Sequence, residues 1–344
     1  MTVPLHLRLG TRRSALARTQ STQMAERLRA LGHTVELVEI VTEGDRDRAT
    51  PLRHLGGTGV FVSALRAALR QGRVDLAVHS LKDLPTNAEE DLVLAAVPSR
   101  EDPRDALVSR AGARLADLRP GARVGTGSPR RRAQLLALGT GLDVRDLRGN
   151  VDTRLAAVTR GDLDAVILAA AGLRRLGRAD VITEALDPAL MLPAPGQGAL
   201  AIESYAARPE VAAALAALDD PATRACVTAE RAVLATLEAG CSAPVGALAR
   251  IVSDASGPST IEVEAVVAAA DGSALLRRRV SAPMPEVRHG IPTPDGPAHP
   301  RADATSENDL PVALGTRLAH LLLDDGAAAL VPDLARSQTT GLGA

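Results

Sequence analysis

Hydrophobic positions in the first hundred residues change repeatedly between the alternating spacing of strands and the three-to-four-residue spacing of helices. Leu16, Met24 and Leu28 fall at helical spacing behind Ser14, which is a suitable N-cap. The pattern predicts strand, helix, strand, helix and strand over residues 5–10, 14–32, 34–41, 60–71 and 74–80. This order is typical of βαβ units, which build a parallel sheet covered on both faces.

The same pattern begins again after residues 98–107. Strands are predicted at 122–127, 142–148 and 164–170. Ser128 and Pro129 predict the start of one intervening helix, and the other covers 150–161. The Pro- and Gly-containing stretch "LPAPGQGALAIES" then leads into another strand, which we expect to return to the first unit.

Beyond residue 219 the order of elements changes. The pattern predicts a helix at 221–238, strands at 245–252, 260–270 and 274–282, and a helix at 311–323. Residues 283–308 are rich in Pro, Gly, Asp and His without periodicity, so we expect a mobile surface insertion there.

We therefore predict an α/β protein with two doubly wound lobes, like those of periplasmic binding proteins, and a small α+β C-terminal domain. The first lobe would comprise residues 1–98 and 199–218, the second lobe 99–198, and the C-terminal domain 219–344.

Composition excludes several classes of protein. Phe61 and Tyr205 are the only aromatic residues among 344, so bases of a single-stranded nucleic acid would find few side chains to stack on. The net charge of −1 gives no general attraction to nucleic acid or membrane. Apolar runs are too short to span a bilayer, no export signal is apparent, and neither a disulfide framework nor a metal site is expected. These features predict a cytoplasmic protein.

Basic residues gather where predicted strands meet helices. Arg12 follows the first strand, Arg130 and Arg131 open a helix, and Arg148 and Arg154 flank the start of another. Ligands of open α/β sheets bind at the carboxyl ends of strands, where helix N-termini also favour anions. We expect a cleft that binds carboxylates or phosphates, whereas Arg132, Arg174 and Arg178 are interpreted as solvated surface residues.

Three further residues suggest chemistry. Lys82 is the only lysine among 40 basic residues, and Asp83 follows it just beyond a strand. Asp83 could transfer a proton or only cap the local backbone. Cys241 lies in the loop "EAGCSAPVG", which indicates an accessible thiol that could carry a modification, whereas Cys226 fits a buried helical position.

Nine stretches together resemble hydroxymethylbilane synthase, a family also called porphobilinogen deaminase. They are "GTRRSALARTQ", "GGTGVFVSAL", "AVHSLKDLPT", "SREDPRDALVS", "VGTGSPRRRAQL", "DLRGNVDTRL", "AGLRRLG", "LPAPGQGALAIE" and "LEAGCSAPVGA". They follow the family's order and cover nearly the whole chain outside the 283–308 insertion.

The resemblance implies a transferase of tetrapyrrole and haem biosynthesis. It would carry a dipyrromethane cofactor through a thioether to Cys241 and add four porphobilinogen units head to tail, each with loss of ammonia. Water would then release the linear hydroxymethylbilane. The family also implies a monomer, and the near-balanced charge predicts no nucleic-acid or membrane partner.

The resemblance assigns roles residue by residue. Asp83 would be the catalytic aspartate, which holds pyrrole N–H groups and assists the loss of ammonia. The cofactor would be bound by Cys241, Lys82, Asp83, Thr126, Ser128, Arg130 and Arg131. The substrate or growing chain would be bound by Arg12, Ser14, Arg148, Asn150, Arg154, Arg175 and Gln197.

The chain departs from the family pattern at a few positions. His54 and Thr58 stand where members often carry two lysines, and Gly127 replaces the first serine of a pair that ends here in Ser128.

Two rival functions fit parts of the pattern. A non-catalytic two-lobed anion-binding protein would explain the junction arginines but would not need Cys241. A nucleic-acid regulator would need a basic domain.

Overall fold

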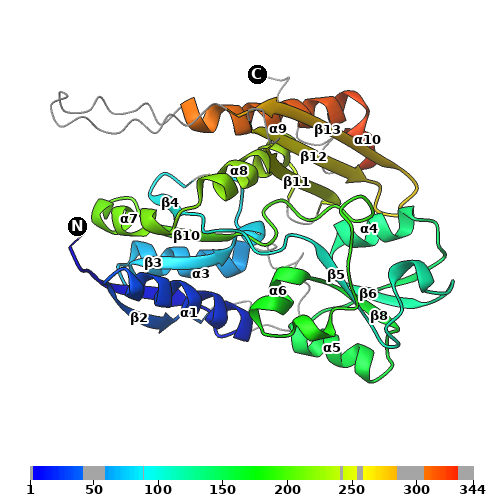
Figure 1. Ribbon diagram of the computed structural model, residues 1–344, viewed down its shortest axis with the longest axis horizontal. Helices are drawn as coiled ribbons and strands as arrows, with labels where there is room; N and C mark the ends of the chain where they lie inside the picture. The colour runs from blue at the N-terminus through cyan, green and yellow to red at the C-terminus, as the bar shows by residue number, and fades with distance from the viewer. Residues whose placement is uncertain are drawn as a thin grey trace, which may run out of the picture.

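The computed structural model describes residues 3–41, 59–87, 89–240, 243–253, 259–284 and 306–331. Its strands form three sheets, two of five strands and one of three. In Figure 1 the two larger sheets lie side by side in the lower half, and the smaller sheet lies above them. The fold class predicted from sequence, two doubly wound lobes and a small α+β domain, is confirmed.

The first lobe is built on the sheet β2-β1-β3-β10-β4. Its elements are β1 (His6–Thr11), α1 (Ala15–Ala30), β2 (Thr34–Glu39), α3 (Gly59–Arg70), β3 (Leu76–Ser80), the 3-10 turn η2 (Leu81–Asp83), β4 (Leu92–Ala96), β10 (Leu200–Tyr205), α7 (Pro209–Leu215) and η5 (Ala216–Leu218). Strands β1, β2 and β3 are parallel, while β10 pairs antiparallel with β3 and β4. Leu9 and Leu28 are buried between this sheet and α1, which joins strand and helix into one core.

The second lobe repeats this arrangement in the sheet β7-β6-β8-β5-β9. Its elements are β5 (Asp105–Ser109), η3 (Leu115–Asp117), β6 (Arg123–Thr126), α4 (Pro129–Ala137), β7 (Asp143–Asp146), α5 (Val151–Thr159), β8 (Ala165–Ala169), α6 (Ala170–Arg175), η4 (Ala179–Val181) and β9 (Glu184–Ala185). Strands β6, β7 and β8 are parallel, and β5 pairs antiparallel with β8. In each lobe, the antiparallel strand is the one that follows a crossing from the other lobe.

The third sheet has the order β11-β12-β13 and is antiparallel. Its domain consists of α8 (Pro221–Thr236), β11 (Val245–Val252), β12 (Thr260–Ala268), β13 (Leu275–Pro283), α9 (Ser306–Asp324) and α10 (Ala327–Leu330). Alternate residues of β12, such as Ile261 and Val263, bury one face of the sheet against Val233 of α8 and Leu318 of α9. This helix-covered sheet is the core of the third domain.

The helix α9 begins earlier than the sequence predicts. It starts at Ser306, with Pro311 inside the helix, whereas the sequence analysis placed its start at Pro311. Proline lacks the N–H that a helix interior uses, so it suggested a helix start. The ends of the predicted 283–308 insertion are thus regular, since Pro283 closes β13 and Ser306 opens α9. Residues 285–305 lie outside the described residues.

Two segments connect the lobes, at residues 97–104 and 186–199. They contact each other closely, because Glu101 N donates to Gly198 O at 3.2 Å. Gly198 has φ +90°, and a Cβ there would lie 2.3 Å from Glu101 O. Only glycine fits this crossing without a shift of the backbone. The crossing brings residues from both connecting segments to the place where the lobes meet.

Candidate active site

Lys82 and Asp83 occupy η2, the short turn that directly follows β3. A turn at the carboxyl end of a parallel strand points its side chains toward the region where open α/β sheets bind ligands. Lys82 Nζ donates to Gln197 Oε1 at 3.2 Å. Gln197 belongs to the second connecting segment and is fully buried. This hydrogen bond ties the turn η2 to the crossing between the lobes.

A buried carboxylate, Asp105, organises the second lobe's side of the site. Arg131 Nη2 and Arg130 Nη1 lie 2.8 Å from its two oxygens. Gln197 Nε2 donates to Asp105 Oδ1, also at 2.8 Å. Burial raises the pKa of Asp105, but Arg130 and Arg131 outweigh it and lower that pKa to about 2. Asp105 is therefore an anion that holds both arginines.

The start of α4 explains why these arginines are available. Ser128 is the N-cap, and its Oγ accepts from Arg131 N at 3.4 Å. Pro129 is the first helical residue, so Arg130 and Arg131 lie in the first turn. Ser128 N in turn donates to Thr126 Oγ1 at 3.2 Å, at the end of β6. Thr126, Ser128 and the two arginines thus form one junction of strand and helix.

The electrostatic balance of this group favours an anionic ligand. Lys82, Arg130 and Arg131 carry three positive charges, and Asp83 and Asp105 carry two negative ones. Burial lowers the pKa of Lys82 to about 8; Asp83 and Asp105 oppose that shift, while Arg131 and Arg130 add to it. An added carboxylate would relieve the repulsion among the three cations.

A second junction of strand and helix in this lobe joins β7, which is parallel to β6, to α5. Asn150 is the N-cap of α5, and its Oδ1 accepts from Thr153 N at 2.9 Å. Arg154 Nε donates to Gly149 O at 2.9 Å. Burial lowers the pKa of Arg154, and the nearby Arg131 lowers it further. Arg148 is exposed and lies 3.6 Å from Asp146. Arg154 therefore belongs electrostatically to the Arg131 group.

Arg12 and Ser14 lie at the start of α1 in the first lobe. Arg12 follows the last residue of β1, and Ser14 caps α1 by accepting from Ala17 N at 3.3 Å. Arg175 is at the end of α6, and its Nη2 donates to Gly198 O at 2.6 Å. Arg175 also lines a pocket between α1 and α6, and neither Lys82 nor Asp83 lines that pocket.

No sequence pattern indicated a role for Asp105, although it lies in the stretch "SREDPRDALVS". An aspartate at the first position of a strand gives no signal of burial by itself. The available signal was the arginine pair at the start of α4, because two adjacent arginines buried in a first turn require a carboxylate partner.

A hydrogen bond between Gln20 and Ser80, which no sequence pattern indicated, joins α1 to β3. Gln20 is buried, and its Nε2 donates to Ser80 Oγ at 3.1 Å, two residues before Lys82. This bond holds the end of β3 against α1. Three positions with predicted roles or departures from the family pattern lie outside the described residues: Cys241, His54 and Thr58.

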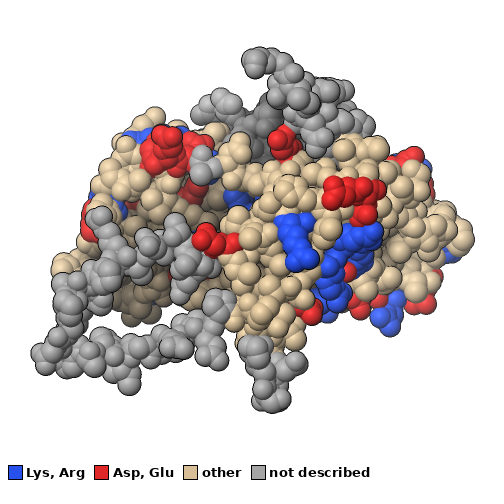
Figure 2. Space-filling model, turned by 90° about the horizontal axis from the view of Figure 1, so that it is seen from above, with Lys and Arg blue, Asp and Glu red and all other residues tan. Residues whose placement is uncertain are grey.

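Charges of both signs share the molecular surface. In Figure 2, which views the molecule from above, basic side chains gather over one part of the face and acidic side chains lie beside them. Across the described ranges, no helix is long and apolar enough to cross a membrane. Nor does any group of three His, Cys, Asp or Glu residues within those ranges have the arrangement of a metal site.

Two family models match the chain. Residues 7–213 match "Porphobilinogen deaminase, dipyromethane cofactor binding domain", and residues 224–289 match "Porphobilinogen deaminase, C-terminal domain". The chain is 51% identical over 335 residues to porphobilinogen deaminase 1 of Streptomyces coelicolor, covering 96% of this chain and 98% of that protein. It is 56% identical over 275 residues to porphobilinogen deaminase of Mycobacterium tuberculosis, covering 79% of this chain and 88% of that one. These matches favour the enzyme over the two rival functions.

Two solved structures that match the chain do so with low similarity scores. A putative methionine-binding lipoprotein of Bacillus subtilis matches with a TM-score of 0.37 and 13% identity, covering 62% of this chain and 89% of that one. The alkanesulfonate-binding protein SsuA of Xanthomonas axonopodis matches with a TM-score of 0.34 and 21% identity, covering 68% and 75%. Scores this low support no inference about ligand or activity.

Proposed function

The chain belongs to the porphobilinogen deaminase family and is a hydroxymethylbilane synthase of tetrapyrrole biosynthesis, and on that premise we propose how its residues share the work. The proposal rests on one observation, the chain of contacts that begins beside Asp83. Lys82, the residue before Asp83 in the turn, bonds to Gln197, and Gln197 bonds to Asp105, the partner of Arg131. A carboxylate and several cations are thereby held together where the two lobes meet.

Asp83 is the catalytic residue in this proposal. The substrate loses ammonia, so positive charge develops on its pyrrole ring. A carboxylate held by a short turn at the end of β3 stabilises that charge without having to reorganise. Asp83 also accepts hydrogen bonds from pyrrole N–H groups, which orients the reacting ring.

The dipyrromethane cofactor of this family fits the residues around Asp83. Each of its pyrroles carries an acetate and a propionate, and the group here has one positive charge more than its carboxylates balance. When bound, the cofactor supplies the primer on which the tetrapyrrole is assembled. We propose that Lys82, Arg130 and Arg131 hold its carboxylates, with Thr126 and Ser128 as hydroxyl donors. Cys241 would supply the thioether.

The substrate and the growing chain are assigned to residues around this group. They are Arg12, Ser14, Arg148, Asn150, Arg154, Arg175 and Gln197. Gln197 has the most direct structural support, since it bonds to both Lys82 and Asp105. The pKa of Arg154 is lowered mainly by burial and further by Arg131, which places Arg154 close to the same group. A monomeric state, a cytoplasmic location, the absence of membrane and nucleic-acid partners, and the domain bounds stay predictions.

The role of Asp83 is tested by Asp83→Asn. The variant keeps the shape of the side chain but removes the charge, so we expect product formation from porphobilinogen to fall about 10²–10⁴-fold. The cofactor should still be present by intact mass. Asp162→Asn is the matched control, because Asp162 is an exposed partner of Arg160 at 2.7 Å and should leave turnover unchanged. Wild-type turnover by Asp83→Asn would remove Asp83 from catalysis.

A further inference from the structure

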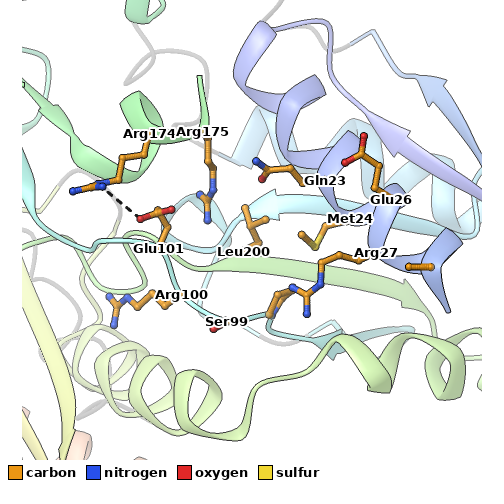
Figure 3. A pocket seen from close by; sticks show the side chains of 12 residues that line it. Gln23, Met24, Glu26, Arg27, Ser99, Arg100, Glu101, Arg174, Arg175 and Leu200 are labelled. Atoms are coloured by element: carbon orange, nitrogen blue, oxygen red, sulfur yellow. Dashed lines mark ion pairs between the residues drawn. The ribbon is translucent and has the colours of Figure 1, made fainter. Parts of the chain in front are cut away.

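A separate pocket of about 570 Å³ lies where the two lobes are connected. Its walls come from the second half of α1, from the connecting segment at residues 98–101, from the end of α6 and from the start of β10. In Figure 3, Arg174 and Arg175 reach down from α6, Gln23 and Arg27 extend from α1, and Glu101 lies beneath α6 beside Arg174. Both lobes and one connecting segment therefore line one space.

This pocket is distinct from the site around Asp83. Arg27 is thirteen residues beyond Ser14, which places it about 20 Å further along the axis of α1. Leu16, near the start of the helix, lies against Gly172 of α6, so the helices touch ahead of the pocket. Arg175 is the only residue assigned above to the substrate that lines it.

Some of the pocket's charges are already balanced. Arg100 forms a two-pronged ion pair with the buried Glu230, at 2.6 and 3.0 Å. Glu101 accepts from Asp102 N at 2.9 Å and lies 3.9 Å from Arg174 Nε. The Arg174 pairs are long, since its Nη2 is 3.5 Å from Asp102. Arg174 thus keeps donors for another anion.

Two other arginines of the pocket have fewer interactions with carboxylates than Arg174 has. Arg175 donates to a neutral carbonyl, Gly198 O. Arg27 is exposed, and within the described parts of the chain no carboxylate forms an ion pair with it. Glu26 and Glu101 are the acidic residues that line the pocket, so two carboxylates stand against the three arginines Arg27, Arg174 and Arg175. The pocket has excess positive charge that is presented from both lobes.

We propose that this hinge pocket, the space lined by α1, α6 and residues 98–101, binds a small anion with several carboxylate or phosphate groups. A volume of about 570 Å³ suits a small molecule, and arginine forks hold oxyanions in a two-pronged geometry. A ligand that contacts Arg27 of one lobe and Arg174 of the other binds best at one angle between the lobes. Its binding therefore favours that angle.

Isothermal titration calorimetry of the holoenzyme tests this proposal without porphobilinogen. Citrate and pyrophosphate are the two probes, and they separate carboxylate from phosphate recognition. We expect at least one of them to bind the wild type, and the affinity to fall about tenfold in Arg27→Glu. Arg174→Glu, on the other lobe, should have a similar effect and provides a second variant should the first not fold.

Arg73→Glu is the matched control. Arg73 is exposed beyond the end of α3 and does not line the pocket, yet its substitution changes the net charge by the same amount. Equal affinity of the three variants and the wild type would overturn the proposal, because binding would then occur elsewhere. Failure of the wild type to bind either probe would overturn it too. Neither result depends on catalysis, so the proposed function is judged separately.

Discussion

At the scale of single residues, Lys82 is the group whose chemistry differs most from that of its surroundings. It is the only lysine in the chain, and it sits with two arginines around Asp105. An arginine stays charged at every pH the protein meets, whereas an ammonium loses its proton when burial disfavours the charge. Burial lowers the pKa of Lys82 to about 8, so its charge depends on pH in a range where the enzyme can be assayed.

This shift predicts a pH dependence for loading of the cofactor. Lys82 is a cation below its pKa of about 8 and becomes neutral above it, so its attraction for carboxylates is lost as the pH rises. One pH unit above that value, about one tenth of the apoenzyme retains the charge. We expect the Lys82→Arg variant to load relatively faster than wild type as the pH increases from about 7 to 9. The measurement is the rate at which apoenzyme gains cofactor mass after addition of hydroxymethylbilane.

The ratio of the two loading rates isolates Lys82. Deprotonation of the Cys241 thiol affects both proteins alike and therefore cancels in the ratio. If the ratio of Lys82→Arg to wild type stays constant across this pH range, Lys82 does not titrate there or does not bind the cofactor.

At the scale of elements, local patterns predicted most of the longer helices and strands, but they did not predict β4, β5, α6, α7 or β9. The strand predicted at 245–252 is β11, because alternate residues such as Val245 and Ala247 bury one face. The start of α4 was likewise visible in Ser128 and Pro129. Such signals lie within a few residues of the feature they report.

The order of strands and the partners of buried charges could not be predicted in this way. β10 lies between β3 and β4, more than a hundred residues away in the chain. Gln197 and Asp105 are 92 residues apart, yet they bond at 2.8 Å. Such contacts follow from the crossing of two connecting segments. The resemblance supplied most of the site residues, but it did not supply Asp105.

The crossing of the connecting segments predicts a strong effect of Gly198→Ala. The added Cβ would meet Glu101 O at 2.3 Å, in addition to the cost of a positive φ. Gly121 is the matched control, because it has φ +79° and no atom within 4 Å of the added Cβ. We expect urea denaturation to show a loss of about 1 kcal/mol for Gly121→Ala and about 3 kcal/mol or more for Gly198→Ala. Equal losses would mean that the two segments do not contact each other as described.

At the scale of the whole molecule, one buried ion pair joins the third domain to a segment that connects the two lobes. Arg100 belongs to the connecting segment and Glu230 to α8 of the third domain. Glu230 also accepts from Gly196 N at 2.6 Å and Ala249 N at 2.8 Å. The Glu230 carboxylate is fully buried, so these partners must compensate for the loss of its hydration. The domain that carries Cys241 is thus fixed to the crossing that holds Gln197.

This connection places α8, the helix that precedes Cys241 in the sequence, next to the crossing. Cys241 follows α8 by a few residues, and α8 is tied through Glu230 to the segment that contains Gln197. Gln197 in turn contacts Lys82 and Asp105. We therefore expect the cofactor attached at Cys241 to extend to the cations around Asp83.

The most direct test is the intact mass of the denatured protein. We predict that wild type carries the added mass of two linked pyrrole units and that Cys241→Ser lacks it. Cys226→Ser is the control, because the other cysteine is buried in α8 and should not affect the modification. Should wild type stay unmodified after incubation with porphobilinogen or hydroxymethylbilane, or should Cys241→Ser carry the same added mass, the covalent cofactor at Cys241 would be contradicted.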